Sequence, residues 1–131
     1  MTLRRTRVRV RYAETDRMGV VYYANYLVWF EVARADWLRS LGWTYREMEE
    51  SGVFLPVIDA RCEYKRPARY DDEVEIRTTG QLVSPIRVAF NYVVTVKGKR
   101  DVAAVGHTTH AATGRDGRPC RLPQRVREVF A

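Results

Sequence analysis

Few side chains in this sequence combine the residue type and the spacing that catalysis or metal binding requires. None of the serines Ser40, Ser51 and Ser84 lies in a nucleophile-elbow motif, which argues against a Ser-His-Asp hydrolase. His107 and His110 are three residues apart in a segment with strand-like alternation, so we expect them on opposite faces, unable to bind one metal ion together. The sequence also lacks both common glycine-rich phosphate-binding motifs. Carboxylates remain as the candidates for chemistry.

Asp16 is the carboxylate with the most informative position, in the loop AETDRMG just before an apolar segment that we predict to be a helix. An aspartate there can stabilise the turn or cap the helix. It can also act as a general base or nucleophile beside the free N–H groups of the helix start, around residues 21–23, which would polarise a carbonyl group. We interpret Glu14 as a surface charge. Glu31 and Arg34 are one turn apart, and we expect them to form an ion pair within the helix or with the sheet.

Two helices are predicted from the pattern that follows this loop. From Val20 to Phe30 there is no charged residue, charges then enter from Glu31 onward, and Gly42 stands where a glycine commonly ends a helix. Because its first half is apolar on all sides, this helix must be enclosed. A shorter helix follows, beginning with a capping box from Thr44 to Glu47.

The rest of the chain alternates between apolar and polar residues with the period of a strand. We predict five strands, at residues 5–12, 57–64, 73–82, 86–96 and 101–112. The economical arrangement is a curved, mainly antiparallel sheet wrapped around the one long helix, which is an α+β hotdog fold. Without repeats, linkers or low-complexity tracts, residues 1–131 are expected to form a single domain.

Composition limits the class of protein and the kind of partner. Hydrophobic residues make up 46% and charged residues 30%, with no apolar run of membrane-spanning length. The N-terminus alternates arginine with valine, unlike a signal peptide, and Cys62 and Cys120 have no metal-binding or redox spacing, so a cytoplasmic protein is expected. The net charge of +7, carried almost entirely by arginine, suits an anionic partner or a solvated basic surface. No nucleic-acid-binding motif accompanies it, and no nucleic-acid partner is expected.

Residues 11–34, RYAETDRMGVVYYANYLVWFEVAR, resemble the signature of hotdog-fold acyl-CoA thioesterases, in the 4-hydroxybenzoyl-CoA thioesterase-like family. The resemblance continues through residues 63–76 and 107–123. It extends to the Tol-Pal-associated acyl-CoA thioesterase branch, with one departure: members of that branch carry a histidine where this chain has Tyr23. Tyrosine there resembles the 4-hydroxybenzoyl-CoA enzyme.

The resemblance implies hydrolysis of an acyl-CoA thioester, with no metal and no cofactor other than the coenzyme A of the substrate. It makes Asp16 the catalytic carboxylate, as nucleophile or general base, and the backbone N–H of Tyr23 the oxyanion contact. In another hotdog branch the carboxylate lies on the central helix, which makes Glu31 the alternative. The predicted substrate-binding residues are Gly19, Val21, Tyr22, Val57, Ile58, Ser84 and Arg87, with Lys65, Arg66 and Arg69 as further cations for the phosphates. Tyr26 and Trp29 are expected to pack inside the sheet.

The resemblance also implies assembly, as a dimer or a homotetramer, with the pocket beside Asp16 completed by the partner around Leu55 to Asp59. Two other functions stay open. One is a non-catalytic acyl-CoA-binding hotdog protein. The other is a hotdog hydratase or dehydratase, which pairs a histidine with a carboxylate near the helix start; the absence of histidine before residue 107 counts against it.

Overall fold

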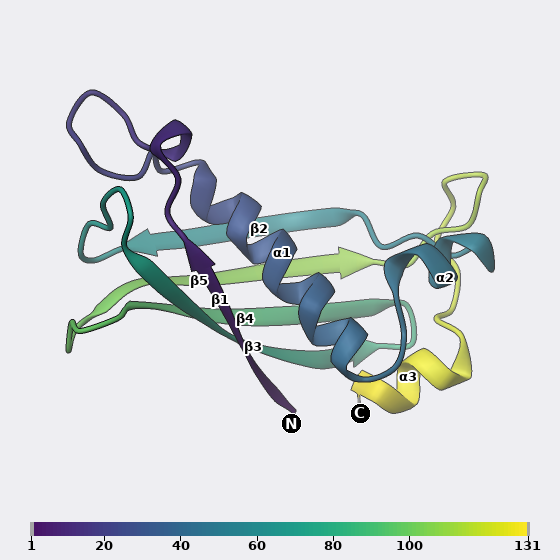
Figure 1. The fold of residues 1–131 in the computed structure, drawn as a ribbon. Helices are drawn as coiled ribbons and strands as arrows, with labels where there is room; N and C mark the ends of the chain where they lie inside the picture. Colours follow the sequence, from purple (N-terminus) through teal and green to yellow (C-terminus); the bar gives the residue numbers. More distant parts are fainter. Residues whose placement is uncertain (1, 131) are drawn as a thin grey trace.

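A five-stranded antiparallel sheet curves behind one long helix (Figure 1). The computed structural model describes residues 2–130. Its strands are β1 (Leu3–Arg9), β2 (Val57–Tyr64), β3 (Glu73–Ser84), β4 (Arg87–Val96) and β5 (Val102–Ala111). Its helices are α1 (Asn25–Ser40), α2 (Tyr45–Glu50) and α3 (Gln124–Phe130), with a short 3₁₀ turn, η1 (Tyr12–Glu14). The strand order β1-β3-β4-β5-β2 leaves β1 and β2 at the edges and confirms the predicted α+β hotdog fold.

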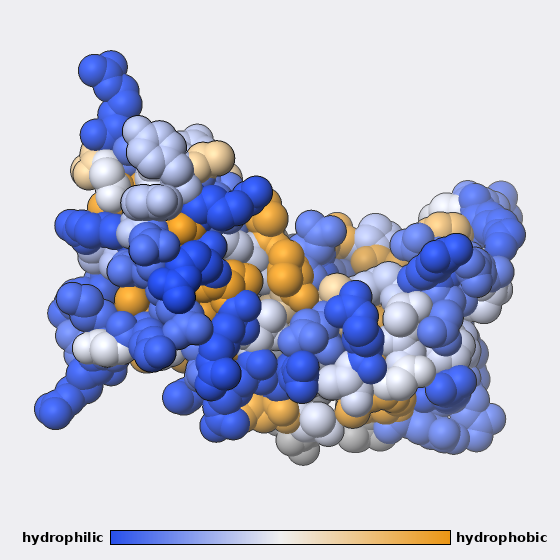
Figure 2. All heavy atoms as spheres, in the orientation of Figure 1, coloured by the Kyte–Doolittle hydropathy of each residue, from blue (hydrophilic) through white to orange (hydrophobic). Residues whose placement is uncertain are grey.

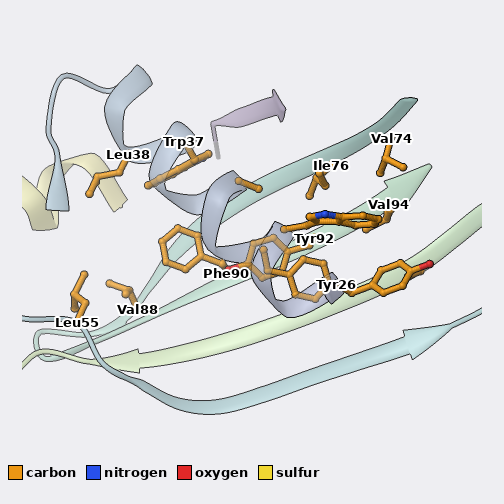
Figure 3. Packing of buried hydrophobic residues seen from close by; sticks show 14 of the residues in the cluster. Tyr26, Trp37, Leu38, Leu55, Val74, Ile76, Val88, Phe90, Tyr92 and Val94 are labelled. Carbon is orange, nitrogen blue, oxygen red and sulfur yellow. The ribbon is translucent and has the colours of Figure 1, made fainter. Parts of the chain in front are cut away.

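Helix α1 packs against the sheet through aromatic side chains spaced three or four residues apart. Phe30 is fully buried and stacks on Tyr92 of β4, with ring centroids 4.3 Å apart. Figure 3 shows Tyr92 among the buried side chains between the helix and the strands. The helix can approach this closely because β5 carries Gly106 there, where an added Cβ would lie 2.3 Å from the Phe30 ring. The predicted core role of Tyr26 and Trp29 is confirmed, since both are nearly fully buried.

The long helix begins five residues later than predicted, and residues 2–130 do not enclose it. The segment before it is fixed by an antiparallel bridge between Thr15 and Val21 and by a hydrogen bond from the Val21 N–H to the Ala68 carbonyl. On the outer side of α1, Leu27, Val28 and Val32 remain 41–47% exposed. Figure 2 shows this apolar surface over α1, between charged side chains. The sheet of one chain covers only one side of the helix, which leaves the other side without cover in this structure.

Most other predicted elements are close to those observed. The Thr44 cap of α2 is confirmed, with its side chain accepting the Glu47 N–H at 3.1 Å. The first strand ends at Arg9 and not at residue 12, because the chain turns there into η1. Helix α3 was not predicted from the sequence; its Phe130 packs against Trp37, with ring centroids 5.0 Å apart.

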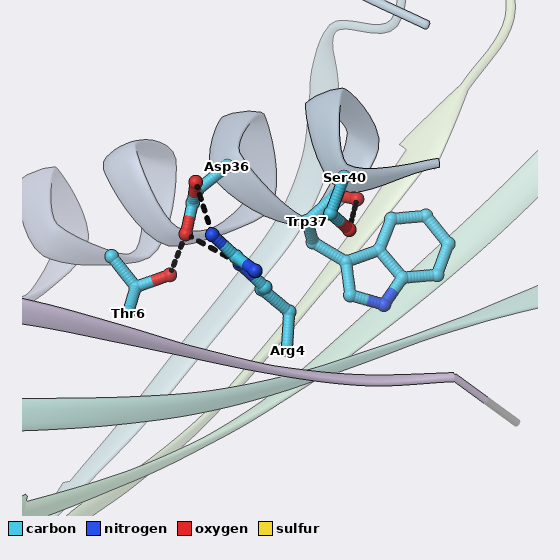
Figure 4. Close-up of polar contacts among 5 residues, drawn as sticks. All are labelled: Arg4, Thr6, Asp36, Trp37 and Ser40. Atoms are coloured by element: carbon cyan, nitrogen blue, oxygen red, sulfur yellow. Dashed lines mark hydrogen bonds and ion pairs between the residues drawn. The ribbon is translucent and has the colours of Figure 1, made fainter. Parts of the chain in front are cut away.

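A polar contact fixes edge strand β1 to the second half of α1. Asp36 accepts hydrogen bonds from Arg4 Nε at 3.0 Å and from the Thr6 hydroxyl at 2.6 Å (Figure 4). Burial pushes the pKa of Asp36 upward, but the hydrogen bonds from Arg4 and Thr6, together with the positive charges of Arg4 and Arg39, hold that pKa below its usual value. This contact holds β1 and α1 in register far along the helix from the Asp16 loop.

Candidate active site

The Asp16 loop is a tight turn that leaves one carboxylate oxygen free. Asp16 N–H donates to Val20 O and Gly19 N–H donates to Asp16 O, both at 2.9 Å. Gly19 has φ +79°, a left-handed conformation that favours glycine. The Asp16 Oδ1 atom accepts the Met18 N–H at 2.9 Å, whereas Oδ2 has no hydrogen-bond partner among residues 2–130. Asp16 therefore stabilises its turn, does not cap α1, and still presents an unengaged oxygen.

Only part of the predicted set of free N–H groups is present. Val21 N–H donates to Ala68 O and Tyr22 N–H donates to Glu14 O, both at 2.8 Å, so the expectation that the N–H groups of these two residues are free was wrong. The reason is that α1 begins at Asn25, and the preceding residues pair with neighbouring loops. The N–H groups of Tyr23 and Ala24 have no acceptor within the described chain.

Asp16 and Tyr23 open into the same cavity. This cavity has a volume of about 340 Å³ and is lined by Asp16, Val20, Val21, Tyr23, Tyr26, Tyr64, Lys65, Arg66 and Pro67. The Tyr64 hydroxyl donates to the Tyr23 carbonyl at 2.9 Å and so holds the peptide on one side of the cavity. Burial is the largest cause that raises the pKa of Tyr64, which keeps the phenol protonated as a donor. We call this space the Asp16 cavity.

Two predicted substrate contacts lie beside the Asp16 cavity without lining it. Tyr22 is 42% exposed and its ring contacts that of Tyr23, with centroids 4.5 Å apart. Gly19 is exposed at the tip of the turn. Tyr22 and Gly19 therefore belong to the rim of the site. The cations Lys65 and Arg66 lie at this rim as well and also line the cavity.

Other predicted substrate contacts are far from Asp16 within one chain, because they lie at the opposite end of the sheet. Ser84 and Arg87 flank the β3–β4 hairpin, about 30 Å along β4 from Val96 at about 3.3 Å per residue. Val96 in turn lies in a cavity that shares Arg66 and Pro67 with the Asp16 cavity.

The pair Val57 and Ile58 is separated from Asp16 in the same way. These residues begin β2, whereas Tyr64 of the Asp16 cavity ends that strand, about 23 Å away. Arg69 lies closer, in the cavity of about 360 Å³ that shares Arg66 with the Asp16 cavity. Ser84, Arg87, Val57 and Ile58 could meet an Asp16 cavity only across a subunit interface.

Glu14 was predicted to be a surface charge, and this was wrong. It is 5% exposed, and its carboxylate accepts the indole N–H of Trp29 at 2.9 Å. Residue spacing could not show this, because Trp29 lies 15 positions later, on the first turns of α1. The one available signal was that a buried tryptophan N–H needs an acceptor.

The ion pair predicted for Glu31 and Arg34, within the helix or with the sheet, is also absent, since neither residue takes part in a salt bridge among residues 2–130. Glu31 is exposed and Arg34 is half-buried. Both line a separate cavity of about 280 Å³, together with Leu27, Val28, Val57, Ala60 and Thr108. Glu31 therefore does not share a cavity with Tyr23 of the same chain.

The two histidines lie on opposite faces of β5, as predicted. His107 contacts Asn91 Oδ1 through Nδ1 at 2.9 Å on the outer face. His110 is fully buried, contacts Leu55 O and Thr108 Oγ1 at 3.0 Å, and has its pKa lowered to about 4 by burial. Among residues 2–130 no three His, Cys, Asp or Glu side chains gather as a metal site would require. Nor does any helix in that range have the length and apolar character to cross a membrane.

Comparison with known proteins places this geometry in context. Residues 10–130 match the family model described as the thioesterase-like superfamily. The solved structure of a hypothetical protein from Aquifex aeolicus is 34% identical, covers 97% of this chain and 98% of its own, and superposes with a TM-score of 0.90. The DHNA-CoA thioesterase of Staphylococcus aureus is 37% identical over 93% of this chain and 82% of its own, with a TM-score of 0.88. The acyl-CoA thioester hydrolase YbgC of Escherichia coli O6:H1 is 42% identical over 59% of this chain and 58% of its own.

Proposed function

This chain belongs to the thioesterase-like superfamily, and from that premise we infer that it is a thioester hydrolase that cleaves acyl-CoA into a carboxylic acid and coenzyme A. One observation carries the assignment of the site. Asp16, whose Oδ2 has no hydrogen-bond partner among residues 2–130, and Tyr23, whose N–H has no acceptor in that range, line a single cavity. Thioester hydrolysis can use a carboxylate as nucleophile or general base together with an N–H that donates a hydrogen bond to the developing oxyanion.

We propose that the Tyr23 N–H donates to the thioester carbonyl oxygen and that Asp16 acts on the carbonyl carbon. As a nucleophile, Asp16 forms a carbon–oxygen bond, the tetrahedral oxyanion collapses with loss of the coenzyme A thiolate, and water then hydrolyses the acyl-enzyme anhydride. As a general base, Asp16 takes a proton from the water that attacks the carbon; the tetrahedral oxyanion then collapses with loss of the coenzyme A thiolate, which takes up that proton. In both routes the N–H of Tyr23 donates a hydrogen bond to the same oxyanion. In both, a water molecule supplies the second oxygen of the carboxylic acid product.

The cations at the rim suit the phosphates of coenzyme A. Lys65 and Arg66 line the Asp16 cavity, and Arg69 lines the cavity next to it. Arginine binds phosphate oxygens in a bidentate manner. We propose Lys65 and Arg66 as phosphate contacts within the chain and Arg87 as a contact from a second subunit, since Arg87 lies at the far end of β4.

We propose that the active assembly is at least a dimer formed through edge strand β2. Val57 and Ile58 of this strand are 45% and 51% exposed, and the uncovered side of α1 lies next to it. Two copies related by a two-fold axis would pair β2 antiparallel, which also protects the open edge. The partner's Val57 and Ile58 would then approach Tyr64, as their predicted role as substrate contacts demands.

A dimer of such dimers, a homotetramer, is the further assembly we propose. The two cysteines are free thiols in this structure, which agrees with a reducing cytoplasm as the compartment.

Sedimentation at micromolar concentration tests the proposed dimer and tetramer. A monomer that retains activity would contradict it.

Release of free thiol from a panel of aromatic, short-chain and long-chain acyl-CoA substrates tests the function itself. We expect turnover of at least one substrate, lowered by about 10²-fold or more in Asp16→Asn. Binding of acyl-CoA without thiol release would identify a non-catalytic binding protein, and hydration of an enoyl-CoA without thiol release would identify a hydratase. Either result would overturn the proposal.

A further inference from the structure

Glu14 is a buried carboxylate two residues before Asp16 that the reaction itself does not use. It is the last residue of η1, and its side chain is 6% exposed. A charged group is rarely buried unless each oxygen has a partner, because desolvation penalises the charged form. The hydrogen bonds of Glu14 explain why a carboxylate is buried so close to Asp16.

Both carboxylate oxygens of Glu14 accept hydrogen bonds from different parts of the chain. Oε1 accepts the backbone N–H of Arg11 at 2.8 Å, and Oε2 accepts the indole N–H of Trp29 at 2.9 Å. The first bond closes the turn at the start of the loop. The second attaches that turn to the buried first part of α1, where Trp29 is 2% exposed.

The backbone carbonyl of Glu14 makes two more bonds in the same direction. It accepts the N–H of Tyr22 and the side-chain amide of Asn25, each at 2.8 Å. Tyr22 immediately precedes the free N–H of Tyr23, and Asn25 is the first residue of α1. One residue therefore holds the loop that carries Asp16 against the segment that carries the Tyr23 N–H.

We propose that Glu14 is a positioning residue for thioester hydrolysis: its buried carboxylate, anchored on Trp29, sets the placement of the Asp16 carboxylate relative to the Tyr23 N–H. The inference rests on the proposed function. It follows from the chain connectivity, since Asp16 is two residues after Glu14 and Tyr23 directly follows its hydrogen-bonded partner Tyr22. A misplacement of about 1 Å between reacting groups can cost about 10²-fold in rate.

Three variants test this role. Glu14→Gln keeps the size of the side chain but replaces one acceptor by an NH₂ donor, which would face the N–H of Arg11 or Trp29. Trp29→Phe removes the indole donor and leaves an aromatic ring. Thr6→Val is the matched control. It removes the hydrogen bond from Thr6 of β1 to Asp36 of α1, which lies far along the helix from Asp16. For each variant, and for the Glu14→Gln/Trp29→Phe double variant, kcat, KM and Tm are measured on a substrate that the wild type hydrolyses.

We expect Glu14→Gln to lower kcat by about 10-fold or more, within the range for misplaced reacting groups, with KM nearly unchanged. The double variant should lose clearly less than the product of the two single effects, because both changes disturb the same anchor between Glu14 and Trp29. Thr6→Val should lower Tm and leave kcat at the wild-type value. If Glu14→Gln does not fold, Trp29→Phe decides alone, with a lowered kcat expected.

Two results would overturn the inference while leaving the proposed function intact. One is a Glu14→Gln or Trp29→Phe protein that, like the control, is less stable but keeps the wild-type kcat. The other is a double variant in which the two effects on kcat multiply. A wild-type protein that releases no thiol from any acyl-CoA would overturn the proposed function, and this inference with it.

Discussion

Replacing Tyr23 by proline removes the backbone N–H that the mechanism assigns to the oxyanion, and the structure makes this change unusually clean. The Asn25 N–H donates to Tyr22 O at 2.9 Å, so Tyr23 occupies the second position of a β-turn. Proline is favoured at that position. Because the Tyr23 N–H has no acceptor within residues 2–130, its removal breaks no hydrogen bond.

The magnitude follows from the role of this group. Loss of one oxyanion donor lowers kcat by about 10²–10³, equivalent to about 2.7–4 kcal/mol of transition-state stabilisation. Stability should change far less, by about 1 kcal/mol or less relative to a matched variant, because proline also restricts the unfolded chain. The match is Tyr23→Ala, which loses the same 61% exposed ring but keeps the N–H.

The assay compares kcat and Tm for Tyr23→Pro, Tyr23→Ala and Tyr23→Phe with the same acyl-CoA. We expect only the proline variant to lose about 10²-fold or more in kcat. If the alanine and proline variants lose activity equally, the tyrosine ring matters and the N–H does not. A proline variant as active as Tyr23→Ala would refute the oxyanion assignment.

Three further predictions concern stability, pH and the phosphates. Because the pKa of His110 is lowered to about 4 in the folded protein, against 6.5 ordinarily, the unfolded state binds the extra proton. The free energy of unfolding should therefore fall as the pH drops from 6.5 toward 4, by up to about 1.4 kcal/mol per pH unit, and His110→Gln should remove this part of the slope in denaturant titrations. Gly106→Ala places a methyl group against the stacked Phe30 ring and should destabilise by about 1–3 kcal/mol, measured by the same titrations; an unchanged stability would contradict the packing. Arg87→Ala and Arg66→Ala should raise KM for full-length acyl-CoA more than they lower kcat, and not for acyl-pantetheine; an unchanged KM would move the phosphate site elsewhere.

The sequence predicted the fold well where alternation and end signals are local. β2 has its predicted limits of Val57 and Tyr64, and the Thr44 cap begins the short helix as expected. The start of α1 was misplaced because Val20 to Ala24 are as apolar as the helix itself. What ends the helix pattern there is tertiary pairing, such as Val21 N–H with Ala68 O, and no local signal encodes that pairing.

The site, like the fold, was predictable only where local sequence signals determine it. The loop containing Asp16 and the N–H of Tyr23 were indicated by their place before the helix and by the family signature. The burial of Glu14 depends on Trp29, 15 residues away, and spacing does not reveal such a contact. The distance of Arg87 from Asp16 depends on the sheet topology. The β3–β4 hairpin lies at the end of β4 opposite to Val96, and Val96 is at the end nearer to the Asp16 cavity.

The most direct test of the central claim is the turnover of Asp16→Asn. Asparagine keeps an oxygen that can accept the Met18 N–H, so the turn, the Tm and the assembly should be nearly unchanged. The charge and basicity are lost, and kcat should fall by about 10²-fold or more, the range for loss of a general base. Hydrolysis of acyl-CoA by this variant at close to the wild-type rate would contradict the account and make Glu31 the next carboxylate to test.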